Sequence, residues 1–377
     1  MLNSRADCVS LSLGNMHGNI NPKQISLFDA LQDRGVIERE GVRLRHIFNS
    51  IISFDNLLVS WQEFLRGKRR RRDVAEFSLK FTDNLSSLHH DLASKTYRHG
   101  GYEAFKINDP KPRDIHKASV RDRLVHHAIC RILYPYFDRK FIYDSYSCRL
   151  GKGTHRAIDR LRQFGRMVSR NNTRTCWVLK CDIRKFFASI EHGILKSILA
   201  KHIDDDDVLW LLSQVVDSFK STGKIGIGLP LGNLTSQLLV NIFMNEFDQF
   251  MKCKLKTKYY IRYADDFVIL HEDRRYLERI IPKISDFLGN KLKLALNYKK
   301  VFIKTLDSGV DFLGWVNFSH HRTLRTSTKK RMLKRLGNNA KPATLASCLG
   351  LLSHGNTHKI AQKICTRHSP VQDGFQF

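Results

Sequence analysis

Apolar residues recur at helical spacing through the first third of the chain. An amphipathic stretch covers residues 55–64, and a second series of apolar positions follows over residues 77–92. Residues 121–139 alternate apolar with basic positions. Because side chains three and four apart share one face of an α-helix, these patterns predict three amphipathic helices, the third with one buried face and one face toward an anion.

Short apolar runs of strand length follow in the middle of the chain. Residues 177–183 form one such run, and two β-prone runs within 258–270 flank Ala264, Asp265 and Asp266. These runs predict a strand that delivers an aspartate near its end and a hairpin that presents two carboxylates at its tip. Helices are also predicted at about 195–200, 207–219 and 275–288, and strands at 301–304 and 310–317, before a helical tail.

The acidic cluster Asp204–Asp207 comes just before the predicted helix over 207–219. The N-terminus of a helix attracts negative charge and needs side-chain acceptors for its free amides. The cluster is therefore interpreted as structural rather than as a metal site.

Composition and charge narrow the class of protein. The chain has 377 residues, of which 42% are hydrophobic, so it folds around a sizeable core and is long enough for several lobes. Its 64 Lys and Arg against 36 Asp and Glu give a formal charge of +28, which favours a nucleic-acid partner. Apolar runs of membrane-spanning length and signal-peptide patterns are missing, so a soluble, cytoplasmic protein that does not bind membranes is predicted.

The cysteines and histidines do not predict a zinc site. The eight cysteines are scattered without a Cys-x-x-Cys pair, a pattern typical of reduced thiols. His354 and His358 are four residues apart, but no glutamate lies between them and no cysteine accompanies them. Both are interpreted as ordinary histidines.

The strongest chemical candidates are the carboxylates of Asp182, Asp265 and Asp266. Nucleotidyl transfer requires activation of a 3′-hydroxyl and neutralisation of a pyrophosphate leaving group, which two divalent ions about 4 Å apart accomplish. Magnesium prefers carboxylate oxygens, and manganese is the alternative ion. Asp182 and Asp265 lie 83 residues apart, so only a sheet that pairs their strands would bring them together.

The order of short motifs resembles that of reverse transcriptases. Tyr263-Ala264-Asp265-Asp266 matches the Tyr-x-Asp-Asp signature of this family, and the resemblance covers roughly residues 50–360. Five neighbours resemble family motifs in the expected order: Lys111 and Arg113 with Arg121-Asp122-Arg123, Asp182 with Phe186-Phe187, Gly232 to Gln237, Lys300, and Phe312-Leu313-Gly314-Trp315.

The resemblance implies an α/β (α+β) right-hand polymerase fold, with a palm built on a small antiparallel sheet that helices cover on one face. The expected domains are an N-terminal extension over 1–50, fingers over 51–175, a palm over 176–318 and a helical thumb over 319–377. Residues 192–229 are expected to be an insertion associated with the fingers. From Phe312 onward the chain has eleven Lys and Arg against one acid, Asp373, which excludes a carboxylate-dependent nuclease there and suits a thumb that grips an RNA–DNA heteroduplex.

The resemblance also implies roles for individual residues. Asp182 and Asp265 would bind both metal ions with help from Asp266, and Phe187 would exclude a ribose 2′-hydroxyl, although core packing is the alternative role for one of Phe186 and Phe187. The residues expected at the dNTP are Lys111, Arg113, Phe187, Gln237 and Lys300. Those expected at nucleic acid are Lys68, Arg69, Arg70, Arg71, Arg72, Arg121, Arg123, Gly314, Trp315, Lys329, Lys330 and Arg331, with a merely solvated surface as the alternative for the block 68–72.

The sequence of the loop 231–237 indicates which branch of the family the chain resembles. Group II intron enzymes carry Gln-Gly-x-x-x-Ser-Pro, whereas this chain has Leu231-Gly232-Asn233-Leu234-Thr235-Ser236-Gln237. This form resembles bacterial diversity-generating retroelements and defence-associated reverse transcriptases, so a maturase role is not expected. The predicted function is copying of a structured noncoding RNA into cDNA. Antiphage defence is favoured by the N-terminal extension, and mutagenesis of a variable gene is the alternative.

Two other classes of protein remain as alternatives. A non-catalytic RNA-binding protein on a polymerase fold would not need all three carboxylates. A polymerase that makes RNA would carry a small residue at position 187, where this chain has phenylalanine. An accessory protein or a second copy of the chain is left open as a further partner.

Overall fold

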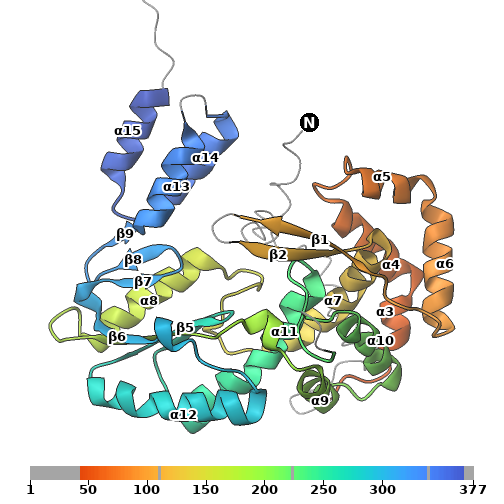
Figure 1. Ribbon diagram of the computed structural model, residues 1–377, viewed down its shortest axis with the longest axis horizontal. Helices are drawn as coiled ribbons and strands as arrows, with labels where there is room; N and C mark the ends of the chain where they lie inside the picture. The colour runs from red at the N-terminus through yellow and green to blue at the C-terminus, as the bar shows by residue number, and fades with distance from the viewer. Residues whose placement is uncertain (1–42, 109–111, 222–224, 338–339, 369–377) are drawn as a thin grey trace, which may run out of the picture.

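The computed structural model describes residues 43–108, 112–221, 225–337 and 340–368. Three lobes can be distinguished: a helical lobe on the right of Figure 1, a sheet at the lower left with helices above and below it, and a lobe of three helices at the upper left. These are fingers, palm and thumb, so the predicted α+β right-hand fold is confirmed. The predictions for residues 1–42 and for Lys111 fall outside the described ranges.

The fingers lobe is a set of helices packed around α7, and Ser53 and Ser119 cap α4 and α7. The predicted single helix over 77–92 is wrong, because the chain breaks at Lys80. This break lets Phe77 and Phe81, on successive helices, both pack against Trp61, at ring distances of 5.2 and 5.1 Å. The helices are α3 (Phe48–Ile52), α4 (Phe54–Leu65), α5 (Arg72–Leu79), α6 (Phe81–Ala93) and α7 (Val120–Lys140).

A hairpin and two helices complete this side of the molecule. The hairpin β1 (Tyr102–Ile107) and β2 (Arg113–Ala118) extends from the fingers over the palm (Figure 1). Helices α9 (His192–His202) and α10 (Asp206–Asp217) lie beneath it. Asp205 caps α10 and also accepts hydrogen bonds from the amides of Ile47 and Phe48, so the acidic cluster has the predicted structural role.

The palm is a four-stranded antiparallel sheet in the order β4-β5-β3-β6. Because side chains alternate along a strand, Leu179 and Phe267 pack toward α11 and α12, whereas Val178 and Val268 pack toward α8. Helices thus cover both faces, not one as predicted. The elements are β3 (Trp177–Asp182), β4 (Tyr260–Tyr263), β5 (Asp266–His271), β6 (Phe302–Thr305), α8 (Thr154–Val168), α11 (Leu234–Gln249) and α12 (Arg274–Leu292).

Helix α8 joins the palm to the thumb, although its residues fall in the range predicted for the fingers. Leu161 and Phe164 lie in the core between α8 and the palm sheet, and Ile158, one turn earlier, lies in the thumb core. Both sets of side chains are buried. The sequence had not predicted this helix, whose apolar positions follow directly on Gly151-Lys152-Gly153.

The thumb begins with a small sheet and continues as three helices. The predicted strand over 310–317 is a tight hairpin, since Leu313 and Gly314 both have positive φ and turn the chain. Trp315 is 1% exposed and packs beneath Gly355, where a Cβ atom would overlap its ring. The elements are β7 (Val310–Phe312), β8 (Trp315–Asn317), β9 (Arg322–Leu324), α13 (Thr326–Leu336), α14 (Pro342–Leu352) and α15 (His358–His368).

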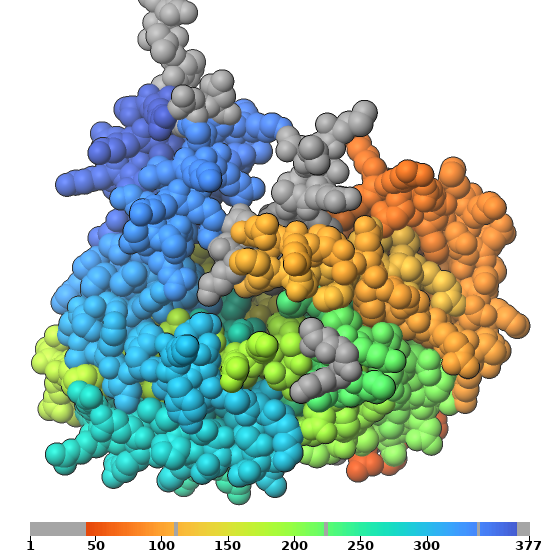
Figure 2. Space-filling view, in the orientation of Figure 1, coloured from red at the N-terminus to blue at the C-terminus, as the bar shows by residue number. Residues whose placement is uncertain are grey.

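The surface is hollowed where the thumb, the β1–β2 hairpin and the palm meet (Figure 2).

The described helices do not include one that is both long and apolar enough to cross a bilayer.

Candidate active site

The palm sheet brings the three predicted carboxylates together at one end. Asp182, the last residue of β3, is paired in register with Asp266, the first residue of β5. Asp265 lies in the turn between β4 and β5, and its carbonyl accepts a 3.1 Å hydrogen bond from the amide of Ile183. Ala264, which has φ of +54°, makes that turn tight. The strand and hairpin predicted from the sequence therefore form one acidic site.

Two lysines hold two of these carboxylates. Lys300 Nζ lies 2.6 Å from Asp182 Oδ2, while the Asn297 side chain donates to Asp182 Oδ1 at 3.2 Å. Lys180 Nζ lies 3.3 Å from Asp266 Oδ2 and donates to the carbonyl of Asp311 at 2.7 Å. The Lys180 side chain is 11% exposed and that of Lys300 is 45% exposed. Lys180 is therefore part of the core, whereas Lys300 has room to move.

Burial and mutual repulsion make the carboxyl groups of Asp265 and Asp266 hard to ionise. Burial raises the pKa of Asp266 to about 7, with a further rise from neighbouring Asp265, and Lys180 opposes the shift. Burial, together with the charge of Asp182, also raises the pKa of Asp265. Without a bound cation, Asp266 therefore holds its proton through acidic pH, and a metal ion would compete with that proton.

The donor set fits a hard divalent cation. All three side chains offer oxygen, and Asp266 Oδ1 is buried without a hydrogen-bond partner among the described residues. As the side chains stand, no three described His, Cys, Asp or Glu groups converge closely enough to hold a metal ion. The Lys300 ammonium in contact with Asp182 explains part of this, since a cation already lies at that oxygen.

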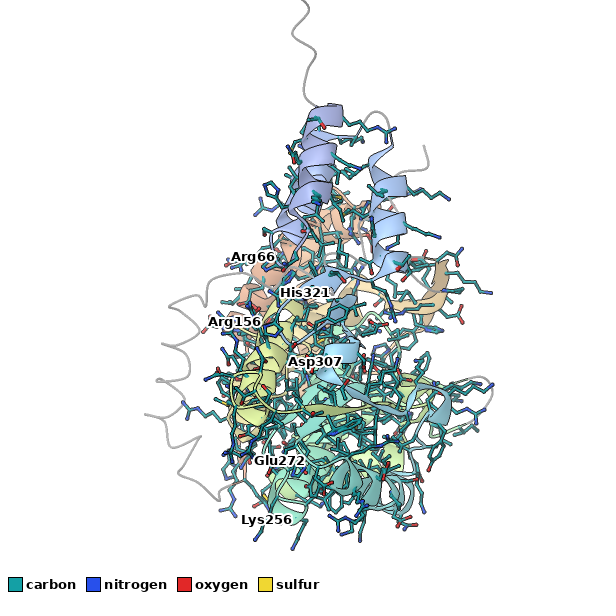
Figure 3. All side chains as sticks on the ribbon, turned by 90° about the vertical axis from the view of Figure 1, so that its left-hand side faces the viewer. Arg66, Arg156, Lys256, Glu272, Asp307 and His321 are labelled. Atoms are coloured by element: carbon teal, nitrogen blue, oxygen red, sulfur yellow. The ribbon has the colours of Figure 1, made fainter. Side chains whose placement is uncertain are left out.

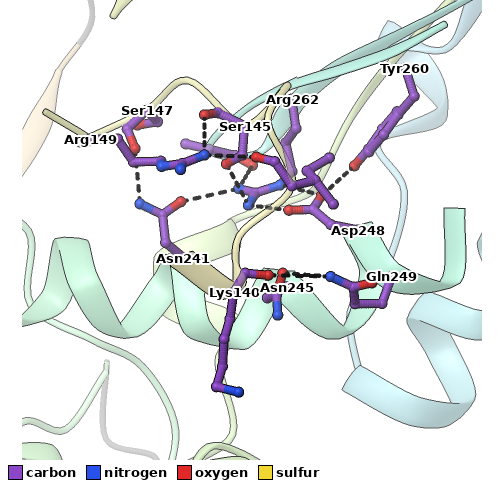
Figure 4. A network of polar contacts seen from close by, with 12 residues as sticks. Lys140, Ser145, Ser147, Arg149, Asn241, Asn245, Asp248, Gln249, Tyr260 and Arg262 are labelled. Carbon is purple, nitrogen blue, oxygen red and sulfur yellow. Dashed lines mark hydrogen bonds and ion pairs between the residues drawn. The ribbon is translucent and has the colours of Figure 1, made fainter. Parts of the chain in front are cut away.

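A buried polar network supports the catalytic turn from below (Figure 4). Arg262, next to Tyr263 in β4, is fully buried and forms two hydrogen bonds with Asp248 of α11, at 2.6 and 2.8 Å. Its guanidinium also donates to the Ala264 carbonyl at 3.2 Å and to Ser145 Oγ at 3.0 Å. Arg262 thus fixes the peptide that carries Asp265.

The loop expected at the nascent base pair connects the palm to the fingers hairpin. The Leu231 carbonyl accepts a hydrogen bond from the His116 amide, and the Asn233 side chain donates to the His116 carbonyl. Gly232 has φ of +105°, and a Cβ atom there would lie 2.8 Å from Ile115. Gln237, one turn into α11, is half-buried. The loop and the hairpin are therefore expected to move together.

Other residues predicted at the nucleotide surround the carboxylates. Burial raises the pKa of both Asp265 and Tyr263, and the charge of Arg113, the exposed first residue of β2, opposes that rise at both side chains. Phe186 is buried in the core and Phe187 is half-buried beside it, with ring centroids 5.5 Å apart. Of the two rings, Phe187 is the one with a surface left to face a nucleotide.

The residues predicted at nucleic acid differ in exposure and in the contacts that they make within the protein. Lys329, Lys330 and Arg331 lie on the exposed face of α13, and Arg69 and Arg70 are exposed before α5. The others have contacts within the protein: Lys68 with the Phe64 ring, Arg72 with Glu76, Arg121 with Asp91, and Arg123 with Asp73. Arg71 and the exposed Arg331 also have partners within the protein.

The predicted contact between the thumb hairpin and nucleic acid needs correction for Trp315. The Trp315 ring is buried in the thumb core, so it positions the thumb and does not reach nucleic acid. Gly314 lies half-buried in the turn of the hairpin, and its carbonyl accepts a hydrogen bond from the amide of Arg325.

Sequence reasoning missed the residues that hold the carboxylates in place. Lys180 and Arg262 are charged residues inside strands that otherwise read as apolar, which is a usable signal because a buried charge requires a partner. Asp248 lies on the helix that crosses under β4, and its pairing depends on the fold. Asn297 has no comparable signal in the sequence.

Lys180→Met is expected to lower the free energy of unfolding by roughly 1–3 kcal/mol, because Asp266 loses its cation and the Asp311 carbonyl loses its donor. Urea unfolding would measure this loss. In an Asp266→Asn background the loss should be smaller, since no charge is then stranded. Lys304→Met, an exposed lysine on β6, is the matched control. An equal loss in both backgrounds would contradict the coupling.

An acidic sheet end set between a fingers hairpin and a basic thumb is the arrangement of a right-hand nucleic-acid polymerase. Comparison with known proteins gives the family: its model, described as reverse transcriptase (RNA-dependent DNA polymerase), matches residues 106–316. The chain belongs to the reverse transcriptase family.

Individual relatives agree with this assignment. Protein YkfC of Escherichia coli (strain K12) is 27% identical over 259 residues, covering 58% of this chain and 65% of that protein. The group II intron-encoded protein LtrA of Lactococcus lactis subsp. cremoris is 24% identical over 302 residues, covering 60% and 48%. The predicted resemblance to bacterial retroelement reverse transcriptases is confirmed, and the chain spans less than two thirds of the length of these relatives.

Among solved structures, apo telomerase from Candida tropicalis is similar with a TM-score of 0.49 and 12% identity, over 72% of this chain and 57% of that one.

Proposed function

We propose that the protein is an RNA-directed DNA polymerase that copies a structured noncoding RNA into cDNA. The observation that carries this proposal is the register of β3 and β5, which sets Asp182 opposite Asp266 with Asp265 in the adjoining turn. Three carboxylates at one end of a polymerase palm suit two-metal nucleotidyl transfer. Magnesium is the proposed ion, with manganese as the alternative.

The proposed mechanism assigns each group a place around the growing end. Asp182, Asp265 and Asp266 would hold the divalent ions, which when bound activate the 3′-hydroxyl and neutralise the leaving pyrophosphate. Lys300 would release Asp182 and turn its ammonium toward the phosphates, as its exposure allows. Arg113 would approach the triphosphate from the fingers hairpin. Gln237 would lie at the nascent base pair.

Two features of the chain support an RNA template and a bacterial retroelement as its biological setting. The exposed cations of α13 suit the phosphates of an RNA–DNA heteroduplex. The loop 231–237 departs from the group II intron form, which supports a bacterial retroelement with a dedicated RNA over an intron maturase. Antiphage defence is the proposed setting, and mutagenesis of a variable gene is the alternative.

The test is DNA synthesis on the RNA that co-purifies with the protein. Wild-type protein with magnesium and labelled dNTPs should give a product that DNase degrades, and sequencing that product identifies the template. A match to a noncoding RNA encoded beside the gene would support a dedicated template, whereas a match to a variable gene would favour the mutagenic role. Inert protein that still binds RNA and fails on a supplied primer–template would overturn the proposal and favour an RNA-binding role.

Phe187→Ala tests whether the product is restricted to DNA. Removing the ring leaves room for a 2′-hydroxyl, so discrimination between dNTPs and rNTPs should fall by about tenfold to a hundredfold. Single-nucleotide incorporation with each substrate measures the ratio of kcat/KM values. Phe302→Ala, which removes a half-buried ring from β6 of the palm sheet, should leave that ratio unchanged. A variant that still excludes ribonucleotides would remove Phe187 from this role.

A further inference from the structure

A cavity of about 230 Å³ lies where α8 meets the base of the thumb. Its floor is apolar, with Leu161, Leu306 and Phe318, and its polar walls come from both lobes. Arg162 belongs to α8, whereas His321, Arg322 and the turn 353–356 belong to the thumb. In Figure 3, which faces this side of the molecule, His321 lies near the base of the thumb and Asp307 lies below it.

The cavity lies away from the catalytic carboxylates. Leu306 in its floor donates its amide to the carbonyl of Cys176, at the start of β3, while Asp182 ends the same strand. Six residues of extended strand separate these points by about 20 Å. The cavity and the polymerase site are therefore at opposite ends of the palm sheet.

The lining of the cavity has the chemistry of an anion site. Within the described part of the chain, the lining includes two arginines and two histidines and no acidic residue. Arg322 is fixed in place by Asp159 at 2.8 Å and by the His354 carbonyl. Arg162 is exposed, and no described carboxylate pairs with it, so its charge is available to a ligand.

The aromatic rings beside these cations are preorganised. His321 stacks on Phe318 with ring centroids 4.5 Å apart, and His354 stacks on His155 at 3.6 Å. Ring planes that are already stacked lose little freedom when a ligand enters. Exposed Ser353 and Asn356 add neutral hydrogen-bonding groups at the rim.

We propose that this cavity binds a phosphate group of an RNA backbone, at a site separate from the catalytic cleft. At about 230 Å³ it is smaller than the roughly 300–1,000 Å³ of pockets for drug-sized ligands, which suits a phosphodiester unit rather than a whole cofactor. The choice of RNA rests on the proposed function and on the continuation of the charge along α8, where exposed Arg166 lies one turn beyond Arg162 without a described carboxylate partner. RNA held here would contact palm and thumb at once.

The test measures RNA binding while the catalytic cleft is filled. The full chain is saturated with an unlabelled RNA–DNA primer–template, and binding of a labelled oligo-uridine RNA is followed by anisotropy over a range of salt. Arg162→Glu and His321→Glu place a negative charge in either wall, and Arg275→Glu on exposed α12 is the matched control. Circular dichroism melting verifies that each variant folds.

Both wall variants should weaken binding of the labelled RNA about tenfold and reduce its dependence on salt, whereas the control should match wild type. DNA synthesis on the supplied primer–template should be unchanged in all three. Loss of oligo-uridine binding once the cleft is filled, or wild-type affinity in both wall variants, would overturn the proposal. Binding of inorganic phosphate at the site without any binding of RNA would also overturn the proposal, in favour of a small-anion site. Failure of the polymerase proposal is seen separately, as wild-type protein inert on the primer–template.

Discussion

Asp265→Asn is expected to lower the rate of DNA synthesis by about a thousandfold or more, because the side chain keeps its shape but loses the charge that would hold a divalent ion. The same change should leave the fold intact or make it more stable. Burial raises the pKa of Asp265, so above that pKa the folded protein contains an ionised carboxylate that would be better solvated in the unfolded chain. Asparagine removes this cost at neutral pH.

Two measurements on one sample test both halves of this prediction. Incorporation of labelled dNTPs on a supplied primer–template gives the rate, and thermal unfolding gives the stability. Asp286→Asn, an exposed aspartate on α12, is the matched control and should change neither quantity. An Asp265→Asn variant that retains a tenth of the wild-type rate would exclude Asp265 from the metal site.

Arg262→Met should lower the free energy of unfolding by about 3–5 kcal/mol, because it strands Asp248 without its partner in the core. The pair is fully buried on both sides. Breaking it also frees the Ala264 carbonyl, so the turn that carries Asp265 loses its support. DNA synthesis should therefore fall even at temperatures where the variant is folded.

A double variant separates stability from positioning. Arg262→Met with Asp248→Leu leaves no stranded charge and should regain part of the stability in urea unfolding, while DNA synthesis stays low because the Ala264 carbonyl still lacks its donor. Arg274→Met breaks an exposed ion pair with Glu278 and should cost less than about 1 kcal/mol. Recovery of full activity in the double variant would show that Arg262 serves stability alone.

The elements that were predicted correctly are those in which local pattern and burial agree. The apolar run that ends at Asp182 and the two runs around Asp265 are strands whose successive side chains are buried on alternate faces, because helices cover both faces of the sheet. The helix over 77–92 failed because the break at Lys80 depends on where Trp61 lies, which local spacing does not contain. The hairpin at Leu313 was hidden because leucine rarely adopts positive φ.

The candidate site shows the same limit at the level of single residues. A carboxylate within an apolar strand can be recognised in the sequence, because its immediate neighbours show that burying its charge would cost free energy. Which carboxylate each lysine and the asparagine hold is known only once β3 is paired with β5 and β6, since Lys300 and Asp182 are 118 positions apart. Which side chains contact each other is therefore determined by how the strands pair, and not by the spacing of residues along the chain.

Helix α8 fixes the base of the thumb to the palm. Ile158 belongs to the thumb core and Leu161 to the palm core, on one continuous helix, so these two lobes cannot separate there without exposing apolar surface to water. If the protein copies RNA as proposed, a thumb anchored in this way would keep its distance from the growing end while the template advances one base at a time. Processive copying of a long RNA would then be limited by the grip of α13 on the duplex and not by opening of the hand.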